Sequence, residues 1–399
     1  MKRNSRALIT AAIRKRGTMS RVQLAEITDI SRTHVSDVVD ELIKEGTLLE
    51  MGSVSSKPGR PRVLLSINPN GPAVAGVWLS EEAVQISIAG ADGEILSRCD
   101  VSYETCTDSP EHAITGIADG IRQCAGRADR TPESLQGVGI AVSGYVEPML
   151  RVIKRTRLNP CFLDIPIERM LGDELGVPVH IEADIRASAL AHNWYSEGED
   201  AALYIWFLDG VGAAFVTDHQ LFGTSHNLAP SVGHMIMVPD GPLCQCGRRG
   251  CLQTYTSTSA FIHRVWSDTD PEKMTANMRH DLVWKGMGLA AQGDMTAIRA
   301  LETTVDYMAL GIANTVNLFD PQVVYIGGVM IDYSPETMMD FVRRETMKSI
   351  NRPYQGVEIR MLPEVNEFVT RGALDLVLLR PYRVLQEINS KMLQLNSAP

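Results

Sequence analysis

Apolar residues recur at helical spacing through the first fifty positions of the chain. The pattern predicts a first helix that ends at Gly17, a second, RVQLAEITD, with Ser20 as its N-cap, and a third, RTHVSDVVDELIKEG, that ends at Gly46. The third helix carries an apolar stripe of Val35, Val38, Val39 and Leu42. Three short helices with a tight turn before the third predict a helix-turn-helix.

Two short stretches after the third helix complete a domain over residues 1–70. TLLEMGSV and RPRVLLSIN predict the strands of a wing, and SSKPGRPR, residues 55–62, joins them. Proline and glycine exclude a helix in this segment, so Arg60 and Arg62 should project from an extended backbone toward phosphates or a minor groove. A basic linker between domains is the alternative interpretation.

From Ala73 onward the pattern changes to strands that alternate with helices. The first half contains the predicted strands AVAGVWLS, AVQISIAG, EILSRCDVSY, GVGIAVSG and VPVHIEAD, with helices over residues 110–127 and 167–175. The second half restarts with ALYIWFLD, GAAFVTDHQ and LFGT, and continues with helices over 257–266, 278–291, 294–300 and a long one ending near 318. The strand VVYIGG, a helix over 336–349, the strand VEIRML and helices after Thr370 follow. We therefore expect two α/β lobes, residues 71–195 and 196–399, with a ligand between them.

The N-terminal domain, called the head below, is basic, whereas the rest of the chain, called the body, is acidic. Residues 1–65 hold twelve Lys and Arg against seven Asp and Glu, about +5, whereas the whole chain of 399 residues has a net charge of −10. A basic segment on an acidic body indicates that only the N-terminus meets a polyanion. The chain has no apolar signal-peptide region and no run of eighteen apolar residues, so we expect a cytoplasmic protein with reduced thiols and no membrane partner.

The start of the third helix supplies the candidate DNA contacts. Its small or hydrogen-bonding side chains suit the major groove and the phosphates, as the recognition helix of a helix-turn-helix requires. With the wing arginines, the candidate DNA-binding residues are Ser31, Arg32, Thr33, His34, Ser36, Arg60 and Arg62. A helical protein-interaction module is the alternative.

Three of the seven cysteines lie within eight positions. They are Cys244, Cys246 and Cys251, and His234 lies ten residues before the first of them. Three thiols and one imidazole form a complete tetrahedral set for Zn²⁺, and the intervening glycines allow the loop to turn tightly. Four protein ligands predict one structural ion per chain, with three buried reduced cysteines as the alternative.

Taken together, these motifs carry a family resemblance over nearly the whole chain. The helix-turn-helix, GRPR, VGIAVSG, EAD, the GH pair before CQCGRRGC, and DPQVVYIGG resemble the ROK family of repressors, open reading frames and sugar kinases. The resemblance implies an actin-like, hexokinase-type (ribonuclease H-like) two-lobed α/β body behind the winged helix-turn-helix. It also implies a repressor that binds operator DNA as a homodimer or homotetramer and senses a sugar.

The turns that hold ATP phosphates in the family's kinases are altered here. Leu79-Ser80-Glu81-Glu82 stands where the kinases have Asp-x-Gly-Gly-Thr, and Leu208-Asp209-Gly210-Val211-Gly212 replaces Gly-Thr-Gly-x-Gly. Carboxylates at these places oppose phosphate binding by like charge. We therefore predict that the protein is not an enzyme.

The resemblance also implies a sugar site. Asp184 matches the family's catalytic carboxylate, here a vestigial base that still contacts the ligand, and Asn159 and His234 match sugar contacts. The chain departs from the family at Ser231 and Gln253, which replace two glutamates, and at Ala183, which replaces an asparagine. The predicted ligand-binding residues are Asn159, Asp184, Ser231, His234 and Gln253, with His234 serving both metal and ligand.

The sequence thus predicts a zinc-containing regulator, a repressor of carbohydrate genes that a sugar or sugar derivative releases from DNA. A ROK sugar kinase with a DNA-binding extension is the alternative from another class. A DNA-binding protein that senses no ligand is the third.

Overall fold

The structure is a computed structural model that describes residues 2–54, 62–102, 109–147, 149–156, 160–195, 199–217, 220–222, 231–351, 356–362 and 365–379. The chain divides into two compact units. Unit 1 comprises Met1–Ser196, Asp218–Gln220 and Asn366–Pro399, and unit 2 comprises Glu197–Thr217 and Leu221–Val365.

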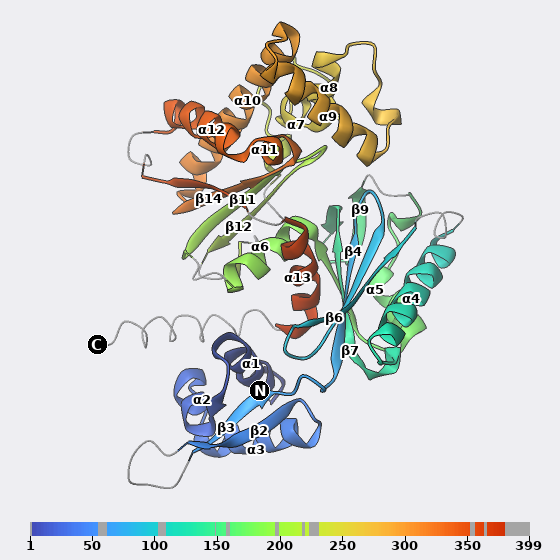
Figure 1. The fold of residues 1–399 in the computed structure, drawn as a ribbon, viewed down its shortest axis with the longest axis vertical. Coiled ribbons are helices and arrows are strands. Elements are labelled where there is room, and N and C mark those ends of the chain that lie inside the picture. Colours follow the sequence, from blue (N-terminus) through green and yellow to red (C-terminus); the bar gives the residue numbers. More distant parts are fainter. Residues whose placement is uncertain are drawn as a thin grey trace. The chain divides into compact units, whose positions relative to one another are not determined.

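The head of unit 1 is a winged helix-turn-helix (Figure 1). Its elements are α1 (Lys2–Arg16), β1 (Met19–Ser20), α2 (Arg21–Thr28), α3 (Arg32–Lys44), β2 (Leu48–Val54) and β3 (Arg62–Ile67), and the strands form a sheet in the order β1-β3-β2. Ser20 and Gln23 form a capping box at the start of α2, and Ser31 accepts a hydrogen bond from the His34 amide at the start of α3. The three predicted helices and the wing are confirmed, and β1 adds a short third strand.

The body of unit 1 is a five-stranded sheet in the order β10-β7-β4-β5-β6. Its strands are β4 (Ala73–Leu79), β5 (Val84–Ala89), β6 (Ile95–Val101), β7 (Leu135–Val142) and β10 (Val179–Ala183). The pairs β4–β5 and β5–β6 are antiparallel, whereas β4–β7 and β7–β10 are parallel. A separate hairpin joins β8 (Gly144–Glu147) to β9 (Val152–Thr156). Because β4, β7 and β10 run in parallel, their carboxyl ends meet at one edge of the sheet.

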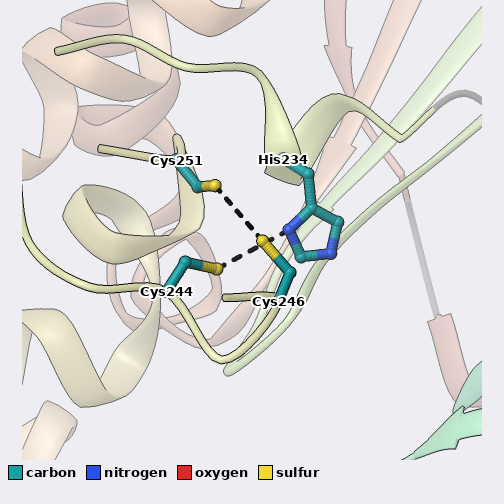
Figure 2. A group of neighbouring side chains, drawn as sticks. All are labelled: His234, Cys244, Cys246 and Cys251. Carbon is teal, nitrogen blue, oxygen red and sulfur yellow. Dashed lines mark hydrogen bonds between the residues drawn. The ribbon is translucent and has the colours of Figure 1, made fainter. Parts of the chain in front are cut away.

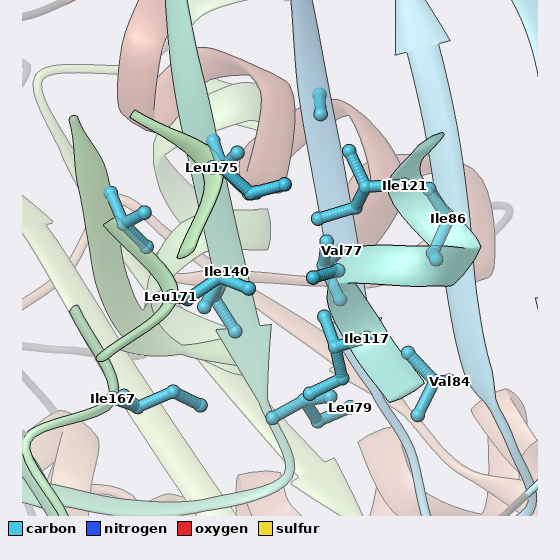
Figure 3. Packing of buried hydrophobic residues seen from close by; sticks show 14 of the residues in the cluster. Val77, Leu79, Val84, Ile86, Ile117, Ile121, Ile140, Ile167, Leu171 and Leu175 are labelled. Atoms are coloured by element: carbon cyan, nitrogen blue, oxygen red, sulfur yellow. The ribbon is translucent and has the colours of Figure 1, made fainter. Parts of the chain in front are cut away.

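Helices cover both faces of this sheet (Figure 1). Alternate residues such as Val77 and Ile140 pack against α4 (Pro110–Arg127) and α5 (Ile167–Leu175) in one apolar cluster (Figure 3). On the other face α13 (Val365–Leu378) approaches so closely that a Cβ at Gly139 would lie 1.8 Å from the carbonyl oxygen of Ala373. This packing places α13 in unit 1, although the sequence assigned the C-terminal helices to the second lobe.

Unit 2 repeats the topology. Its sheet has the order β13-β12-β11-β14-β15, formed by β11 (Ala201–Phe207), β12 (Val211–Thr217), β13 (Gln220–Leu221), β14 (Val323–Gly327) and β15 (Glu358–Met361). The pair β11–β12 is antiparallel, and β11–β14 and β14–β15 are parallel, as in unit 1. The helices are α7 (Gln253–Thr256), α8 (Thr258–Val265), α9 (Ala276–Ala291), α10 (Met295–Phe319), α11 (Val329–Tyr333) and α12 (Pro335–Ser349). Two sheets of the same strand order confirm the predicted pair of similar α/β halves.

Besides the short elements β1, β8, β9, α7 and α11, which the sequence did not predict, the structure differs from the predicted helices at three places. The sequence did not predict α6 (Asp184–Tyr195), which begins where the strand VPVHIEAD was expected to end. One continuous helix, α10, replaces the two predicted over 294–318, and α13 begins at Val365 rather than after Thr370. Among the described residues, no helix is both long and apolar enough to cross a bilayer.

Candidate metal centre and ligand site

The predicted zinc ligands converge in unit 2 (Figure 2). His234 ends a short 3₁₀ turn, Val232–His234, and the three cysteines lie on the loop that precedes α7. The ligand atoms of His234, Cys244, Cys246 and Cys251 all lie within 4.8 Å of one another. Cys244 Sγ is 3.7 Å from His234 Nδ1, and Cys246 Sγ is 3.6 Å from Cys251 Sγ.

These distances fit a single tetrahedral ion. Two sulfurs bound to one zinc at about 2.3 Å are separated by about 3.8 Å, and a sulfur and an imidazole nitrogen by about 3.6 Å. The observed separations of 3.6 Å and 3.7 Å are close to both values. The arrangement can therefore hold a metal ion, with two of the sulfurs, those of Cys244 and Cys251, belonging to buried residues.

Two glycines shape the loop. Gly247 and Gly250 have φ of +83° and +70°, in the left-handed region that favours glycine. At Gly250 a Cβ would also lie 1.6 Å from the carbonyl oxygen of Val238, so a side chain has no room. At Gly247 nothing lies within 4 Å of an added Cβ. The backbone therefore requires glycine at 250 more strictly than at 247.

Gln253 lies beside the metal cluster. Its side-chain nitrogen is 3.4 Å from Cys244 Sγ, as a donor that orients and stabilises a thiolate ligand would be. Burial raises the pKa of the Cys251 thiol to about 12 in the absence of a cation. The structure thus gives Gln253 a contact with Cys244, a candidate metal ligand, that the sequence did not predict. The predicted role of Gln253 in sugar binding stays a prediction.

Asp184 lies at the carboxyl edge of the sheet in unit 1. It follows β10 and opens α6, and Ser143 follows the neighbouring strand β7. The Ser143 hydroxyl donates to Asp184 Oδ2 at 2.5 Å, and the Ile185 amide donates to Oδ1 at 2.7 Å. Trp78 Nε1 donates in turn to the Ser143 hydroxyl at 3.4 Å. The carboxylate is therefore held in a fixed orientation.

Burial controls the charge of Asp184. It raises the pKa of this carboxyl to about 6, while the hydrogen bonds from Ser143 and Ile185 act in the opposite direction. The nearby Glu81 carboxylate also raises it. At neutral pH the group is mostly ionised and can accept a hydrogen bond from a ligand hydroxyl.

The first altered phosphate turn, after β4, is closed by its own side chain. Ser80 Oγ accepts hydrogen bonds from the Glu82 and Ala83 amides at 3.3 Å and 3.2 Å, and donates to the Ala83 carbonyl. Backbone amides bind phosphate only when they point at it unpaired. Here Ser80 occupies the donors that a phosphate would need.

Asp209, in the second altered turn between β11 and β12, pairs with groups outside that turn. Its Oδ1 accepts from the Thr258 hydroxyl at 2.9 Å and from the Ser259 amide at 3.0 Å, at the start of α8. Its Oδ2 is 3.1 Å from Nε of Arg279, and both side chains are buried. A carboxylate of the protein itself thus takes the place of an anion at this helix end.

The candidate DNA contacts have different environments. Ser31, Arg32 and Thr33 are exposed at the start of α3, and Arg62 is exposed at the start of β3. His34 is half-buried, with Nε2 3.0 Å from the hydroxyl of Ser5 on α1. This hydrogen bond links α3 to α1, so His34 has a structural role in the domain in addition to its predicted contact with DNA.

Other predicted positions divide between the units or lie outside the described residues. Asp184 belongs to unit 1, whereas Ser231, His234 and Gln253 belong to unit 2. Arg60, Asn159 and the part of the predicted C-terminal helices after residue 379 fall outside the described residues. Sequence reasoning missed Ser143 and Trp78; the available signal was that parallel strands bring the residues after VGIAV and HIEA to the same edge.

Comparison with known proteins gives consistent results. The model of the ROK family matches residues 74–379. A putative xylose repressor from Caldicellulosiruptor sp. (strain Rt8B.4) is 28% identical over 334 residues, covering 82% of this chain and 83% of its own. A glucokinase from Thermotoga maritima is 25% identical and covers 76% of this chain and 96% of its own.

A solved structure extends the likeness to nearly the full length. The crystal structure of a ROK family transcriptional regulator, a homolog of the E. coli MLC protein, superposes with a TM-score of 0.75 at 19% identity. It covers 96% of this chain and 99% of its own. Since the family model spans residues 74–379, both sheets and the cysteine cluster included, the chain belongs to the ROK family.

Proposed function

We propose that this protein is a DNA-binding transcriptional repressor that a sugar releases from its operator, that it carries one structural zinc ion, and that it has no kinase activity. The winged helix-turn-helix is the observation that best supports a role in DNA binding. The glucokinase match leaves about a quarter of this chain without a counterpart, whereas the regulator of known structure matches 96% of it. The exposed residues at the start of α3 present the donors that operator recognition needs.

A structural ion suits the four-ligand cluster. His234, Cys244, Cys246 and Cys251 would hold it, and a bound Zn²⁺ would cross-link the Val232–His234 turn to the loop that precedes α7. With four protein ligands no coordination position is left for a substrate. Gln253 supports the choice of zinc because a buried donor beside Cys244 Sγ stabilises the thiolate.

The closed phosphate turns oppose the kinase alternative. Ser80 pairs with the Glu82 and Ala83 amides of the first turn, and Asp209 of the second turn pairs with the Ser259 amide at the start of α8. ATP would have to break these internal hydrogen bonds before it gained its own. Displacement of the Asp209 carboxylate by a phosphate would also remove it from the buried guanidinium of Arg279. We therefore expect that this protein does not bind nucleotide.

Asp184 is the proposed contact for the sugar. A buried, mostly ionised carboxylate held by Ser143 and the Ile185 amide is suited to accept a hydroxyl proton in a hydrogen bond. Xylose is the first effector to test, because the repressor relative at 28% identity is named for it. A dimer or tetramer would let a small change in the spacing of two heads weaken binding to paired half-sites.

The test is selection of DNA by the wild-type protein from a random duplex pool, followed by measurement of Kd with and without D-xylose. We expect enrichment of one paired motif, an affinity that falls steeply with salt, and weaker binding in D-xylose or another sugar of a panel. Arg32→Ala should weaken binding to the selected motif by about tenfold. Arg127→Ala, which removes an exposed arginine from α4 of the body, is the matched control and should have no effect.

Absence of any enriched motif, or equal losses for Arg32→Ala and Arg127→Ala, would contradict the assignment of the head. ATP consumption that depends on sugar and exceeds a blank containing heat-denatured protein would instead support the kinase.

A further inference from the structure

Helix α6 connects the proposed sugar contact with the DNA-binding head. Asp184 is its first residue, and Trp194 and Tyr195 are its last two. Twelve helical residues span about 17 Å, and every side chain from Asp184 to Trp194 is buried. Because protein interiors are close-packed, a buried helix cannot shift at one end without repacking its neighbours.

The C-terminal end of α6 contacts α1 of the head. The Lys15 ammonium lies 4.6 Å from the centroid of the Trp194 ring. Trp194 belongs to the same apolar cluster as the buried residues of α1, α2 and α3. From α1, Arg14 also donates to the carbonyl oxygens of Ala91 and Leu378, both at 2.6 Å. The head therefore shares one continuous core with the body.

Helix α13 completes this contact. The Tyr195 hydroxyl donates to Asp375 Oδ1 at 3.1 Å, and the Arg371 guanidinium lies 5.0 Å from the centroid of the Tyr195 ring. Arg371 also donates to the Gly93 carbonyl at 2.9 Å, in the turn between β5 and β6. The α6 joint is defined here as Arg14, Lys15, Trp194, Tyr195 and Asp375.

Along its length α6 has little freedom against α13. A Cβ at Gly372 would lie 2.4 Å from the carbonyl carbon of Ala187, so the two backbones are in direct contact. Further along, the rings of His192 and Phe368 meet edge-on with centroids 4.8 Å apart. This close packing leaves α6 little room to move relative to α13 at these positions.

The α6 joint contains two buried polar atoms that lack a hydrogen-bond partner within the described part of the chain. They are Asp375 Oδ2 and Trp194 Nε1. Unpaired buried polar groups cost free energy, so an arrangement of the joint that pairs either atom would recover part of it. A conformational switch requires an element that can adopt two arrangements. The two unpaired atoms make the α6 joint a candidate for such an element.

We propose that α6 transmits sugar binding from Asp184 to the winged helix-turn-helix through the α6 joint. This inference rests on the proposed function, which assigns the sugar to Asp184 and DNA to the head. Occupancy of Asp184 shifts the start of α6, and Trp194 and Tyr195 then change the position of α1 against α13.

A double-mutant cycle tests the route without a known effector. Asp184→Asn alters the charge at the start of α6, and Tyr195→Phe removes only the hydroxyl that meets Asp375. We expect Asp184→Asn to change Kd for the selected DNA at least fivefold in the wild-type background and less than twofold with Tyr195→Phe. Tyr333→Phe, which removes a hydroxyl from unit 2, should preserve the full effect. Positions this far apart without shared partners ordinarily act independently.

Hydrogen exchange of the α1 amides is the second measurement and needs no DNA. Asp184→Asn should change protection over residues 8–16, and Tyr195→Phe should abolish that change. If the wild type selects no DNA motif, the proposed function fails while this measurement still decides the route. If Tyr195→Phe does not fold, Lys15→Met, an exchange of an exposed lysine over Trp194, replaces it. The proposal would be overturned by two results together. The effects of Asp184→Asn and Tyr195→Phe on Kd would combine independently to within twofold, and Asp184→Asn would leave the hydrogen exchange of the α1 amides unchanged.

Discussion

Asp375 should make the stability of unit 1 depend on pH. Its side chain is fully buried, and burial raises the pKa of this carboxyl to about 7 from an ordinary value of 3.8, against the lowering effects of Tyr195, Arg371 and Arg14. Below pH 4 the carboxyl is protonated in the folded and unfolded chains alike. Between pH 4 and 7 the unfolded chain ionises first, so stability falls as pH rises, and above pH 7 the loss is complete.

The size of this loss follows from the same two values. At 1.36 kcal/mol for each pH unit, a carboxyl that titrates near 7 instead of 3.8 costs on the order of 4 kcal/mol of stability at pH 8. Asp375→Asn keeps the shape and an acceptor for the Tyr195 hydroxyl but removes the titration. Relative to wild type, the variant should therefore gain about 1.4 kcal/mol for each pH unit between pH 4.5 and 6.5.

Urea unfolding followed by circular dichroism from pH 4.5 to 8.5 measures this difference. The relevant transition is the one in which the α13 amides lose protection from exchange, because a chain of two units need not unfold in one step. Asp184, whose pKa is also raised, is present in both proteins, so its contribution cancels. Asp173→Asn, at an exposed position on α5, is the control and should follow wild type. Parallel curves for wild type and Asp375→Asn, within about 0.5 kcal/mol, would refute the reasoning.

Three further outcomes are expected. The purified protein should contain close to one equivalent of zinc by elemental analysis, and Cys246→Ser should lower both the zinc content and the melting temperature, whereas equal zinc in the variant would exclude this cluster as the site. Gly247→Ala should cost about 1 kcal/mol for its left-handed backbone, and Gly250→Ala several times more, because a Cβ there meets the Val238 carbonyl. Millimolar MgATP should leave the melting temperature unchanged; a clear increase would show that Ser80 and Asp209 do not close the phosphate turns.

Local patterns made most of the fold predictable. Caps and glycines set the ends of the head helices, and apolar alternation set the strands, because both depend on neighbours in sequence. The cluster of His234 and three cysteines that could hold a metal was predictable for the same reason, since the cysteines lie within eight positions. Helix α6 was not predicted. Its sequence, DIRASALAHNWY, is buried on all sides and so lacks the amphipathic period that marks a surface helix.

Contacts between distant segments could not be predicted. The partners of Asp184 and Asp375, Ser143 and Tyr195, lie 41 and 180 positions away in sequence and become neighbours only through the sheet and α13. The role of Gln253 likewise depends on the folded loop, which brings its amide to Cys244. Sequence separation alone gives no signal for such contacts.

The proposed absence of kinase activity also limits how the proposed switch can work. In a protein that hydrolyses no nucleotide, sugar binding alone must shift the head between its states. A ligand shifts an equilibrium only by its preference for one state over the other. A hundredfold loss of operator affinity therefore requires that the sugar bind the DNA-free protein a hundredfold more tightly than the DNA-bound protein. By the same linkage, saturating operator DNA should weaken the sugar's affinity by that factor, and titration calorimetry with and without DNA measures both sides. A sugar affinity that saturating operator DNA leaves unchanged would show that the two sites are not coupled.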